Sequence, residues 1–328
     1  MNSEPLISII IPTYNRENTI AETLDSVLSQ TYANWECIAV DDGSTDSTIN
    51  ILDVYSKKDS RFQYFQRPSH KEKGANSCRN YGFEKSKGSF IQWLDSDDLL
   101  SKFCFEKRVQ TILEKQLDFV VASTAYLNNN NSKEEIVNQD SEHVTNEDYL
   151  IQFLSYNLPW CILSPMWKRS IISEFHFDEN LQRFQDVDFH IRILASNKFK
   201  FDRLYEIDTY YRIGLNNPKG DLHVKKVLNS FVPFFNKIQP LTDSNPRKKH
   251  FRTFVSTFLF SQGFPNFILF KEEVKAILKI IYKSNTYNLY QKGLVAIESF
   301  ILDKKLYKIK GIGLYRLRTW IKSQLLPT

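Results

Sequence analysis

Three aspartates, Asp95, Asp97 and Asp98, stand within four positions directly after the apolar run "FIQWL". Carboxylates this close repel one another unless a cation offsets their charge. A D-x-D pattern at the end of a strand therefore suits a hard divalent ion, Mn²⁺ or Mg²⁺, whose other ligands would be water and phosphate oxygens. An alternative of equal weight is that Asp97 or Asp98 only caps a following helix.

A second acidic segment is "AVDDGSTDST", residues 39–48. Gly43 permits a tight turn, and Asp41 ends an apolar run, where its carboxylate can accept a hydrogen bond from a base or a ribose. Asp42 and Asp46 are interpreted as turn and cap residues. This second segment favours a ligand site over capping alone.

Short apolar runs alternate with amphipathic stretches around these acids. The sequence predicts strands over 6–11, 35–40, 61–66, 89–94 and 118–123, and helices over 46–57, 75–86 and 102–116, with a further helix that Thr19 and Glu22 start as a capping box. This alternation predicts an α/β fold, a Rossmann-like and mostly parallel sheet flanked by helices. Ligands of such sheets bind beyond the carboxyl ends of the strands, where "PTYNR", "DDGSTD" and "DSDD" all fall.

The second half of the chain is mainly helical in pattern. Residues 128–143 are polar and indicate an irregular surface segment, and "FQDVDFHIRIL" at 184–194 predicts a helix. The stretch "GLNNPKGD" at 214–221 is the best linker, so we expect a catalytic domain over residues 1–215 and a smaller helical region over 216–328.

Composition places the chain among globular proteins, with 328 residues, 42% hydrophobic and 25% charged. The four cysteines are widely spaced and form no C-x-x-C, which predicts reduced thiols and a cytoplasmic location. We expect neither a secretion signal nor a membrane-spanning segment.

The positive charge is concentrated in the tail. Residues 301–328 hold seven Lys and Arg against one Asp, which gives 7 − 1 = +6, although the whole chain is only +5. Leu314, Leu317, Ile321 and Leu325 form a stripe there, which is compatible with packing on the protein or with peripheral contact to an anionic membrane. No nucleic-acid-binding motif is present, so nucleic acid is not an expected partner.

Five segments occur in a characteristic order, namely "SIIIPTYNR", "VDDGSTD", "GANSCRNYG", "WLDSDD" and "QDVDFHIR". With them the chain resembles glycosyltransferase family 2, inverting enzymes of the GT-A fold, over roughly residues 6 to 213. The resemblance implies that Pro12, Thr13 and Tyr14 wall a nucleotide pocket, that Asp41 binds the base, that Arg79 contacts the nucleotide or holds the pocket, that Asp95 lies by the ribose or metal, and that Asp97 ligates the metal on the donor diphosphate.

The same resemblance makes Asp186 the catalytic base that takes a proton from the acceptor hydroxyl. The alternative for Asp186 is an acid that only satisfies a helix start. Asp188 and Arg192 have the i, i+4 spacing of an ion pair on the helix surface. The chain departs from the family pattern at Gln185, where a glutamate is usual, and in lacking a histidine shortly after Arg212. A phosphate or metal contact is therefore either missing or supplied by Asn216, Arg212 or the C-terminal region.

The expected function is a metal-dependent inverting transfer from a nucleotide-sugar donor, in the first place a UDP-sugar, to a cell-surface glycan or lipid-linked acceptor. A sugar-phosphate nucleotidyltransferase is the alternative of similar topology, although no Gly-rich loop follows the first strand. A nucleotide-sugar-binding protein without catalysis is the third. A dinucleotide oxidoreductase is disfavoured because no G-x-G-x-x-G follows the first strand.

Overall fold

A computed structural model describes residues 4–127, 133–137, 144–196, 199–213, 220–309 and 313–326, with backbone alone for 133–137. Its internal contacts divide the chain into two compact units. Unit 1 contains residues 1–144, 158–180 and 196–217, and unit 2 contains residues 145–157, 181–195 and 218–328. The predicted domain boundary after residue 215 and most of the predicted linker fall within 214–219, outside the described residues.

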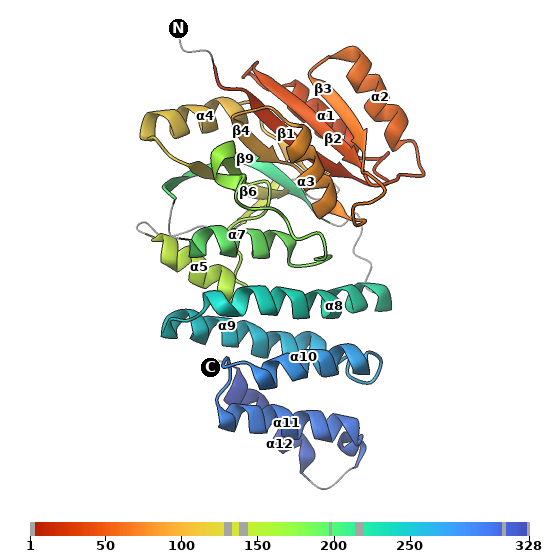
Figure 1. Ribbon diagram of the computed structural model, residues 1–328, viewed down its shortest axis with the longest axis vertical. Helices are drawn as coiled ribbons and strands as arrows, with labels where there is room; N and C mark the ends of the chain where they lie inside the picture. The colour runs from red at the N-terminus through yellow and green to blue at the C-terminus, as the bar shows by residue number, and fades with distance from the viewer. Residues whose placement is uncertain are drawn as a thin grey trace. The chain divides into compact units, whose positions relative to one another are not determined.

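Unit 1 is built on one mixed sheet (Figure 1). Its strands are β1 (Ile7–Thr13), β2 (Trp35–Asp41), β3 (Phe62–Gln66), β4 (Phe90–Trp93), β5 (Leu99–Leu100), β6 (Phe119–Leu127), β7 (Lys133–Val137), β8 (Pro165–Lys168) and β9 (Phe201–Arg212). They follow the order β3-β2-β1-β4-β8-β6-β9-β5, with β7 paired to β6. The pairs among β1 to β4 are parallel, whereas β8 runs antiparallel to both of its neighbours. The predicted GT-A type sheet flanked by helices is confirmed.

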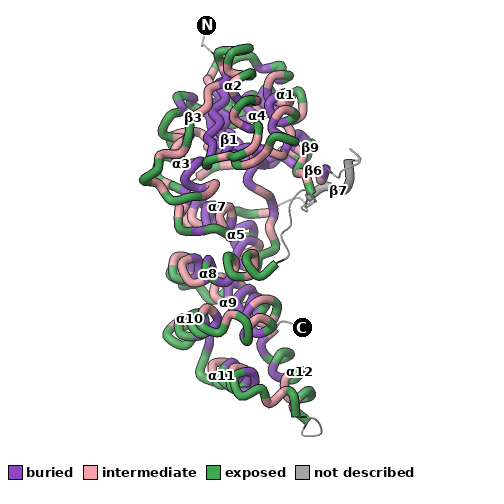
Figure 2. The backbone as a smooth tube through the Cα atoms, turned by 90° about the vertical axis from the view of Figure 1, so that its right-hand side faces the viewer, coloured by how far each residue is buried: buried purple, intermediate pink, exposed green. Residues whose placement is uncertain are grey.

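Strand β1 lies at the centre of unit 1 and is buried along its whole length, as the purple tube in Figure 2 shows. Ile7, Ile9 and Ile11 share one face because side chains alternate along a strand. They pack with α1 (Ile20–Leu28), α2 (Thr48–Lys58) and α4 (Cys104–Lys115). Ile10 faces α3 (Ala75–Lys85) on the other side of the sheet. The continuous apolar run therefore reflects burial on two faces.

Two expectations for unit 1 are wrong. The Thr19 side chain makes no capping hydrogen bond to α1, because its hydroxyl donates to the Ser96 carbonyl oxygen, at 3.0 Å. Residues 128–143 are not irregular throughout, since β7 pairs with β6 within them, and the remainder of that segment lies outside the described residues.

Unit 2 is helical. It contains α5 (Asn146–Leu154), α7 (Gln185–Ala195), α8 (Asp221–Ile238), α9 (Asn245–Phe258), α10 (Lys271–Lys283), α11 (Leu289–Asp303) and α12 (Leu314–Leu325), with short turns η1 (Gln239–Leu241), η2 (Leu259–Gly263) and η3 (Leu306–Lys308). The short helix α6 (Arg169–Ile172) belongs to unit 1. Within the described part of the chain, no helix is both long and apolar enough to cross a membrane.

An aromatic cluster forms much of the core of unit 2. Phe231 stacks on Phe258 with ring centroids 4.0 Å apart, and Phe184 lies 4.9 Å from Phe234. Helices α8, α9 and α10 run side by side in Figure 1, and α8 and α9 carry most of the cluster. The cluster joins α8 and α9 to the segment that enters α7, so Phe184 ties α7 to the C-terminal helices.

Candidate functional site

The loops that follow β1 and β2 are hydrogen-bonded to each other. The Asn15 amide donates to Ser44 Oγ at 2.9 Å, the Thr45 amide donates to Asn15 Oδ1 at 2.8 Å, and the Arg16 amide donates to Thr48 Oγ1 at 2.7 Å. Parallel strands end at the same edge of the sheet, which places "PTYNR" beside "DDGSTD". The predicted common edge is therefore present for these two motifs.

Residues 12–14 offer two side chains suited to a nucleotide. Thr13 is buried, and its hydroxyl has no hydrogen-bond partner among the described residues. Tyr14 is 41% exposed, and Lys73 Nζ lies 4.4 Å from the centre of its ring. Pro12, directly before them, is buried within β1, which ends at Thr13. The edge thus presents a free hydroxyl, an aromatic face and a cation.

Asp41 shapes the turn after β2. Its carboxylate accepts hydrogen bonds from the amides of Gly43 and Ser44, at 3.0 Å each, and from the Ser44 hydroxyl. Gly43 has φ +89°, as a tight turn of this kind requires. Asp41 is fully buried. The Ser44 amide also donates to Asp41 Oδ1 at 3.3 Å, so these contacts use about all four lone-pair sites of the carboxylate, and Asp41 fixes the turn.

The two other acids of this segment have structural partners. Asp42 forms an ion pair with Arg67. Asp46 Oδ1 accepts hydrogen bonds from the amide and hydroxyl of Thr48, at 3.0 Å and 2.6 Å. The interpretation of Asp46 as a turn residue is confirmed.

The acidic turn after β4, residues 95–98, is surrounded by arginines. Arg79 is buried and donates to Asp95 Oδ1 at 2.6 Å. Arg16 Nε lies 3.4 Å from Asp97 Oδ2. These ion pairs offset part of the repulsion between the carboxylates. Of the two roles considered for Arg79, the contacts fit the one that holds the pocket.

Asp98 is fully buried in this turn. Its Oδ1 accepts a hydrogen bond from the Arg212 amide at 2.9 Å, and its Oδ2 has no partner in the described parts of the chain. Burial, followed by the charges of Asp95 and Asp97, raises the pKa of Asp98 well above the usual carboxyl value. Burial and then Asp95 also raise the pKa of Asp97. The turn therefore holds more negative charge than its surroundings favour.

A divalent cation fits the chemistry of this turn. Asp95 and Asp97 are partly exposed. Burial and the repulsion from Asp95 raise the pKa of Asp97, and an added positive charge would offset that repulsion. In the described residues no three His, Cys, Asp or Glu side chains form a metal-binding group. Mg²⁺ is usually held by one or two carboxylates and substrate phosphates, so two aspartates suffice. The capping alternative is wrong, because α4 begins later, after Phe103, without a side-chain cap.

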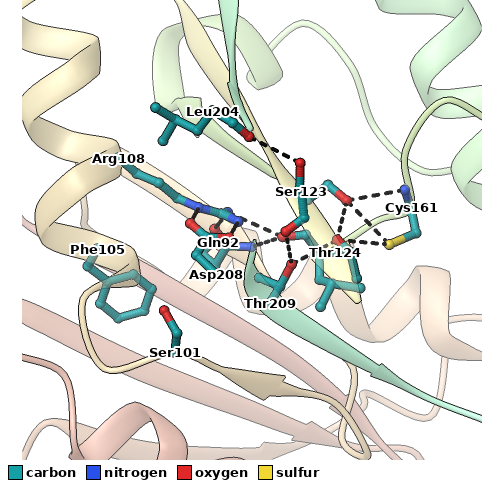
Figure 3. A network of polar contacts seen from close by, with 12 residues as sticks. Gln92, Ser101, Phe105, Arg108, Ser123, Thr124, Cys161, Leu204, Asp208 and Thr209 are labelled. Atoms are coloured by element: carbon teal, nitrogen blue, oxygen red, sulfur yellow. Dashed lines mark hydrogen bonds and ion pairs between the residues drawn. The ribbon is translucent and has the colours of Figure 1, made fainter. Parts of the chain in front are cut away.

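A buried polar network supports the elements that carry this turn (Figure 3). Arg108 of α4 donates to both carboxylate oxygens of Asp208 in β9, at 2.7 Å and 2.6 Å, and to Gln92 Oε1 in β4 at 2.6 Å. Gln92 lies just before the acidic turn, and Asp208 lies four residues before Arg212. The network therefore fixes the two strands whose ends meet at Asp98.

Asp186 lies in unit 2, at the second residue of α7. It is partly buried, and its Oδ1 accepts a hydrogen bond from the Val187 amide at 3.0 Å. Burial and then the charge of Asp186 raise the pKa of Tyr156 to about 12. Asp186 is thus an accessible carboxylate close to a tyrosine, both in unit 2.

The chain is strained directly before this helix. Phe184 has φ +62°, a conformation that costs a bulky side chain about 1–3 kcal/mol. The aromatic cluster around its ring holds it there. Such strain persists only where surrounding structure over-determines it, and it is common at functional sites.

Asp188 and Arg192 form the predicted i, i+4 pair, with an Nη2–Oδ2 distance of 2.7 Å. The pair is not on the surface as expected, because Asp188 is fully buried and Lys237 Nζ lies 3.9 Å from its Oδ1. Gln185, which stands where a glutamate is usual, donates to the Leu181 carbonyl oxygen at 2.9 Å. Asp188 thus has a structural role.

Sequence reasoning missed the roles of two arginines. Arg16 follows "PTYN" and pairs with Asp97, and Arg212 ends β9 and binds the acidic turn. The only available signal was their position at strand ends. Asn216, considered as a substitute for the missing histidine, lies outside the described residues.

Residues 8–175 match the family described as glycosyl transferase family 2. Glycosyltransferase GlyG of Streptococcus pneumoniae is 32% identical over 218 residues, which cover 61% of this chain and 69% of GlyG. The Escherichia coli protein WfgD, named UDP-Glc:alpha-D-GlcNAc-diphosphoundecaprenol beta-1,3-glucosyltransferase, is 38% identical over 125 residues, 38% of this chain and 48% of WfgD. The match spans only 26% to 46% of the length of four other curated relatives.

Solved structures share the fold. The crystal structure of S. aureus TarS 1-349 in complex with UDP-GlcNAc superposes with a TM-score of 0.64 at 20% sequence identity. The alignment covers 83% of this chain and 78% of the TarS chain. The similarity therefore extends beyond the half of the chain that matches the family.

Proposed function

This chain belongs to glycosyl transferase family 2, and from that premise we propose that it is an inverting glycosyltransferase that uses a UDP-sugar as donor. The observation that carries the proposal is the edge of unit 1 where Thr13 and Tyr14 present free ligand-binding groups. At the ends of neighbouring strands of the same sheet, Asp95 and Asp97 form an acidic turn that suits a cation. Those are the two halves of a nucleotide diphosphate site.

The donor would bind along this edge. Tyr14 offers a ring on which a base can stack, and Thr13 offers its hydroxyl. Asp41, which holds the turn after β2, would form the part of the pocket beside the base. The name of WfgD specifies UDP-Glc, and TarS was solved with UDP-GlcNAc, which supports uracil as the base. The identity of the sugar is left open.

Asp97, with Asp95, would hold Mn²⁺ or Mg²⁺. When bound, the ion would offset the charge that develops on the departing diphosphate. Arg79 would keep Asp95 in place, as its 2.6 Å bond to that side chain suggests. Arg16 adds a second positive group beside Asp97, in reach of an anionic ligand at this edge.

Asp186 would act as the base. An inverting transfer forms the new bond to the sugar on the face opposite the departing diphosphate, while the acceptor hydroxyl loses its proton to the carboxylate. Its Oδ1 accepts a hydrogen bond from the adjacent Val187 amide, and its side chain is partly accessible, as this role requires. The strained Phe184 would fix its direction.

The acceptor would be a cell-surface glycan or a lipid-linked saccharide. The name of WfgD includes a diphosphoundecaprenol-linked acceptor, which supports the second class. A cytoplasmic location, at the inner face of the membrane, would give access to such a lipid. The four cysteines are free thiols, which is compatible with that compartment.

A donor panel tests the proposal. The protein is incubated with Mn²⁺ and UDP-, GDP- or dTDP-sugars, and binding and nucleotide release are measured. We expect the protein to bind UDP-sugars only. In Asp97→Asn the affinity for the donor should fall by more than about a hundredfold, because the metal would lose a ligand. Asp186→Asn should bind the donor normally and lose transfer by about 10²–10⁴-fold.

Asp202→Asn is the matched control, since Asp202 forms a surface pair with Lys115 at 2.5 Å. It should behave as the wild type in both assays. Metal-independent donor binding would contradict the role of Asp97. Transfer at the native rate by Asp186→Asn would show that another group is the base.

A further inference from the structure

The apolar stripe predicted in the tail is mostly covered by the protein, and its first two residues, Leu314 and Leu317, are half-buried. Ile321 and Leu325 are buried, and α12 packs on α11. Arg318 of α12 also donates to Glu298 of α11 at 2.7 Å. The packing alternative therefore holds for this stripe, and any exposed apolar surface must lie elsewhere.

Such a surface is present on the outward side of α11. Tyr290, Gly293, Ile297 and Phe300 follow one another at spacings of three, four and three residues, so they share one face of the helix. All four are exposed, and Phe300 remains 56% accessible. Leucines and valine on the opposite face are buried, namely Leu294, Val295 and Leu302.

Helix α11 is therefore apolar on both faces. A helix at the surface of a globular protein normally has a polar outward face. A contiguous exposed apolar face marks a site of interaction with another surface. The alternation of buried and exposed residues along α11 is visible in Figure 2.

The charges around this face are positive. Lys304 follows Phe300 by one helical turn. Lys305 is the next residue, and Lys308 comes three positions later; all three are exposed. In the described parts of 289–326 the carboxylates are Glu298, which pairs with Arg318, and Asp303, which pairs with Lys271 at 2.5 Å. Asp303 also interacts electrostatically with Lys304, so a single acid that already has a lysine partner stands beside three lysines.

Helix α12 adds further groups of the same kind. Trp320 is 46% exposed, and Arg316 lies one turn before it on the same face. Tyr315 and Lys322 are exposed as well. Trp and Tyr are enriched where proteins meet the membrane–water interface, together with Lys and Arg.

We propose that the outward face of α11, with the lysines that follow it, binds the surface of an anionic phospholipid bilayer. Ile297 and Phe300 enter the headgroup region, and Lys304, Lys305 and Lys308 contact lipid phosphates. A second protein chain fits less well, because lysine is depleted in the centre of protein interfaces. The proposal does not depend on the reaction that the protein catalyses.

Vesicle sedimentation tests this. The full chain is mixed with phosphatidylcholine vesicles that contain or lack phosphatidylglycerol, at low and high salt. We expect binding to the anionic vesicles alone, weakened by salt. Ile297→Ser with Phe300→Ser should weaken binding by more than about tenfold, and Lys304→Gln with Lys305→Gln by roughly tenfold to thirtyfold.

Leu222→Ser is the control, because Leu222 is a 69% exposed leucine of α8, outside this face. It should bind vesicles as the wild type does, and circular dichroism should show every variant folded. Equal binding to neutral vesicles, or no binding at all, would overturn the proposal. So would self-association of the wild type that Ile297→Ser with Phe300→Ser abolishes while vesicle binding persists.

Discussion

Arg212 is the residue that most directly shapes the acidic turn. Its amide donates to Asp98 Oδ1 and its Nε donates to the Asp97 carbonyl oxygen, both at 2.9 Å. Its Nη2 forms an ion pair with Glu22 of α1. Backbone and side chain of one residue thus hold both a carboxylate and a carbonyl of the turn, which orients Asp97 toward its proposed ligand.

Replacing Arg212 by lysine should weaken the binding of UDP with Mn²⁺ by roughly fivefold. Lysine keeps the charge but cannot maintain the guanidinium hydrogen bond to Asp97, and one such bond is worth about 1 kcal/mol. Titration calorimetry measures the change. Glu22→Gln is the control, because it changes only the ion-pair partner of Arg212 outside the turn, and it should bind UDP within about twofold of the wild type. Unchanged affinity in Arg212→Lys would contradict the role of Arg212 in holding the acidic turn.

The sequence identified the acids of the site better than their partners. Asp95 and Asp97 form a local pattern that is visible in one short stretch. Their arginines come from residues 16, 79 and 212, and ion pairs between residues so far apart leave no local pattern. The placement of Asp186 in a different unit from Asp97 was equally hidden.

At the scale of elements, the approach of α3 to the sheet positions Arg79. A Cβ atom at Gly82 would lie 2.5 Å from Ile10 Cγ2 and 3.3 Å from Val40 Cγ2. Only glycine permits this closeness, because real contacts of Cβ atoms are longer. The packing of α3 on β1 and β2 therefore sets the reach of Arg79 to Asp95.

Gly82→Ala should destabilise the protein by about 1–3 kcal/mol, since a methyl group would force α3 away from β1. The affinity for UDP should fall as well, because Arg79 would shift together with α3. Denaturant unfolding measures the stability.

Gly293→Ala is the matched control on a helix, because nothing lies within 4 Å of its Cβ position. It should leave stability unchanged or raise it by up to about 1 kcal/mol. Equal effects of the two changes would argue against the close contact.

Most of the strands that the sequence predicted are buried on both faces. Strands β1, β2 and β4 are buried along their whole length and β6 along most of it, whereas β3 is buried only at Phe62. Strand β9 was missed because it reads "FDRLYEIDTYYR", with charged residues among the apolar ones and an irregular burial pattern. Its place in the sheet depends on pairing with β6, which no local pattern encodes.

For the whole molecule, acid should act through unit 2. His190 of α7 is fully buried beside Phe153, and burial lowers its pKa to about 3. The unfolded chain binds this proton near pH 6.5, whereas the folded chain does so only near pH 3. The contribution of neutral His190 to the free energy of unfolding is thus complete above pH 6.5 and is lost as the pH falls from about 6.5 to about 3.

Between these two pH values, protonation of His190 in the unfolded chain lowers the free energy of unfolding of the wild type by about 1.4 kcal/mol per pH unit. We expect His190→Leu to lack this part of the pH dependence. Urea unfolding at pH 5 and pH 7 measures the slope. His70→Ala, at an exposed position, should keep the wild-type slope. A wild-type slope in His190→Leu would show that other groups govern the acid response.

The path of the chain between the units has an evolutionary consequence. The chain passes from one unit to the other five times, and Phe184, directly before the helix that carries the proposed base, packs against α8 and α9, which come later in the sequence. A crossover between two relatives in the middle of their genes would separate Phe184 from the partners that hold it. New acceptor preferences in this lineage are therefore expected to arise by successive point changes across several segments, and not by exchange of a terminal cassette.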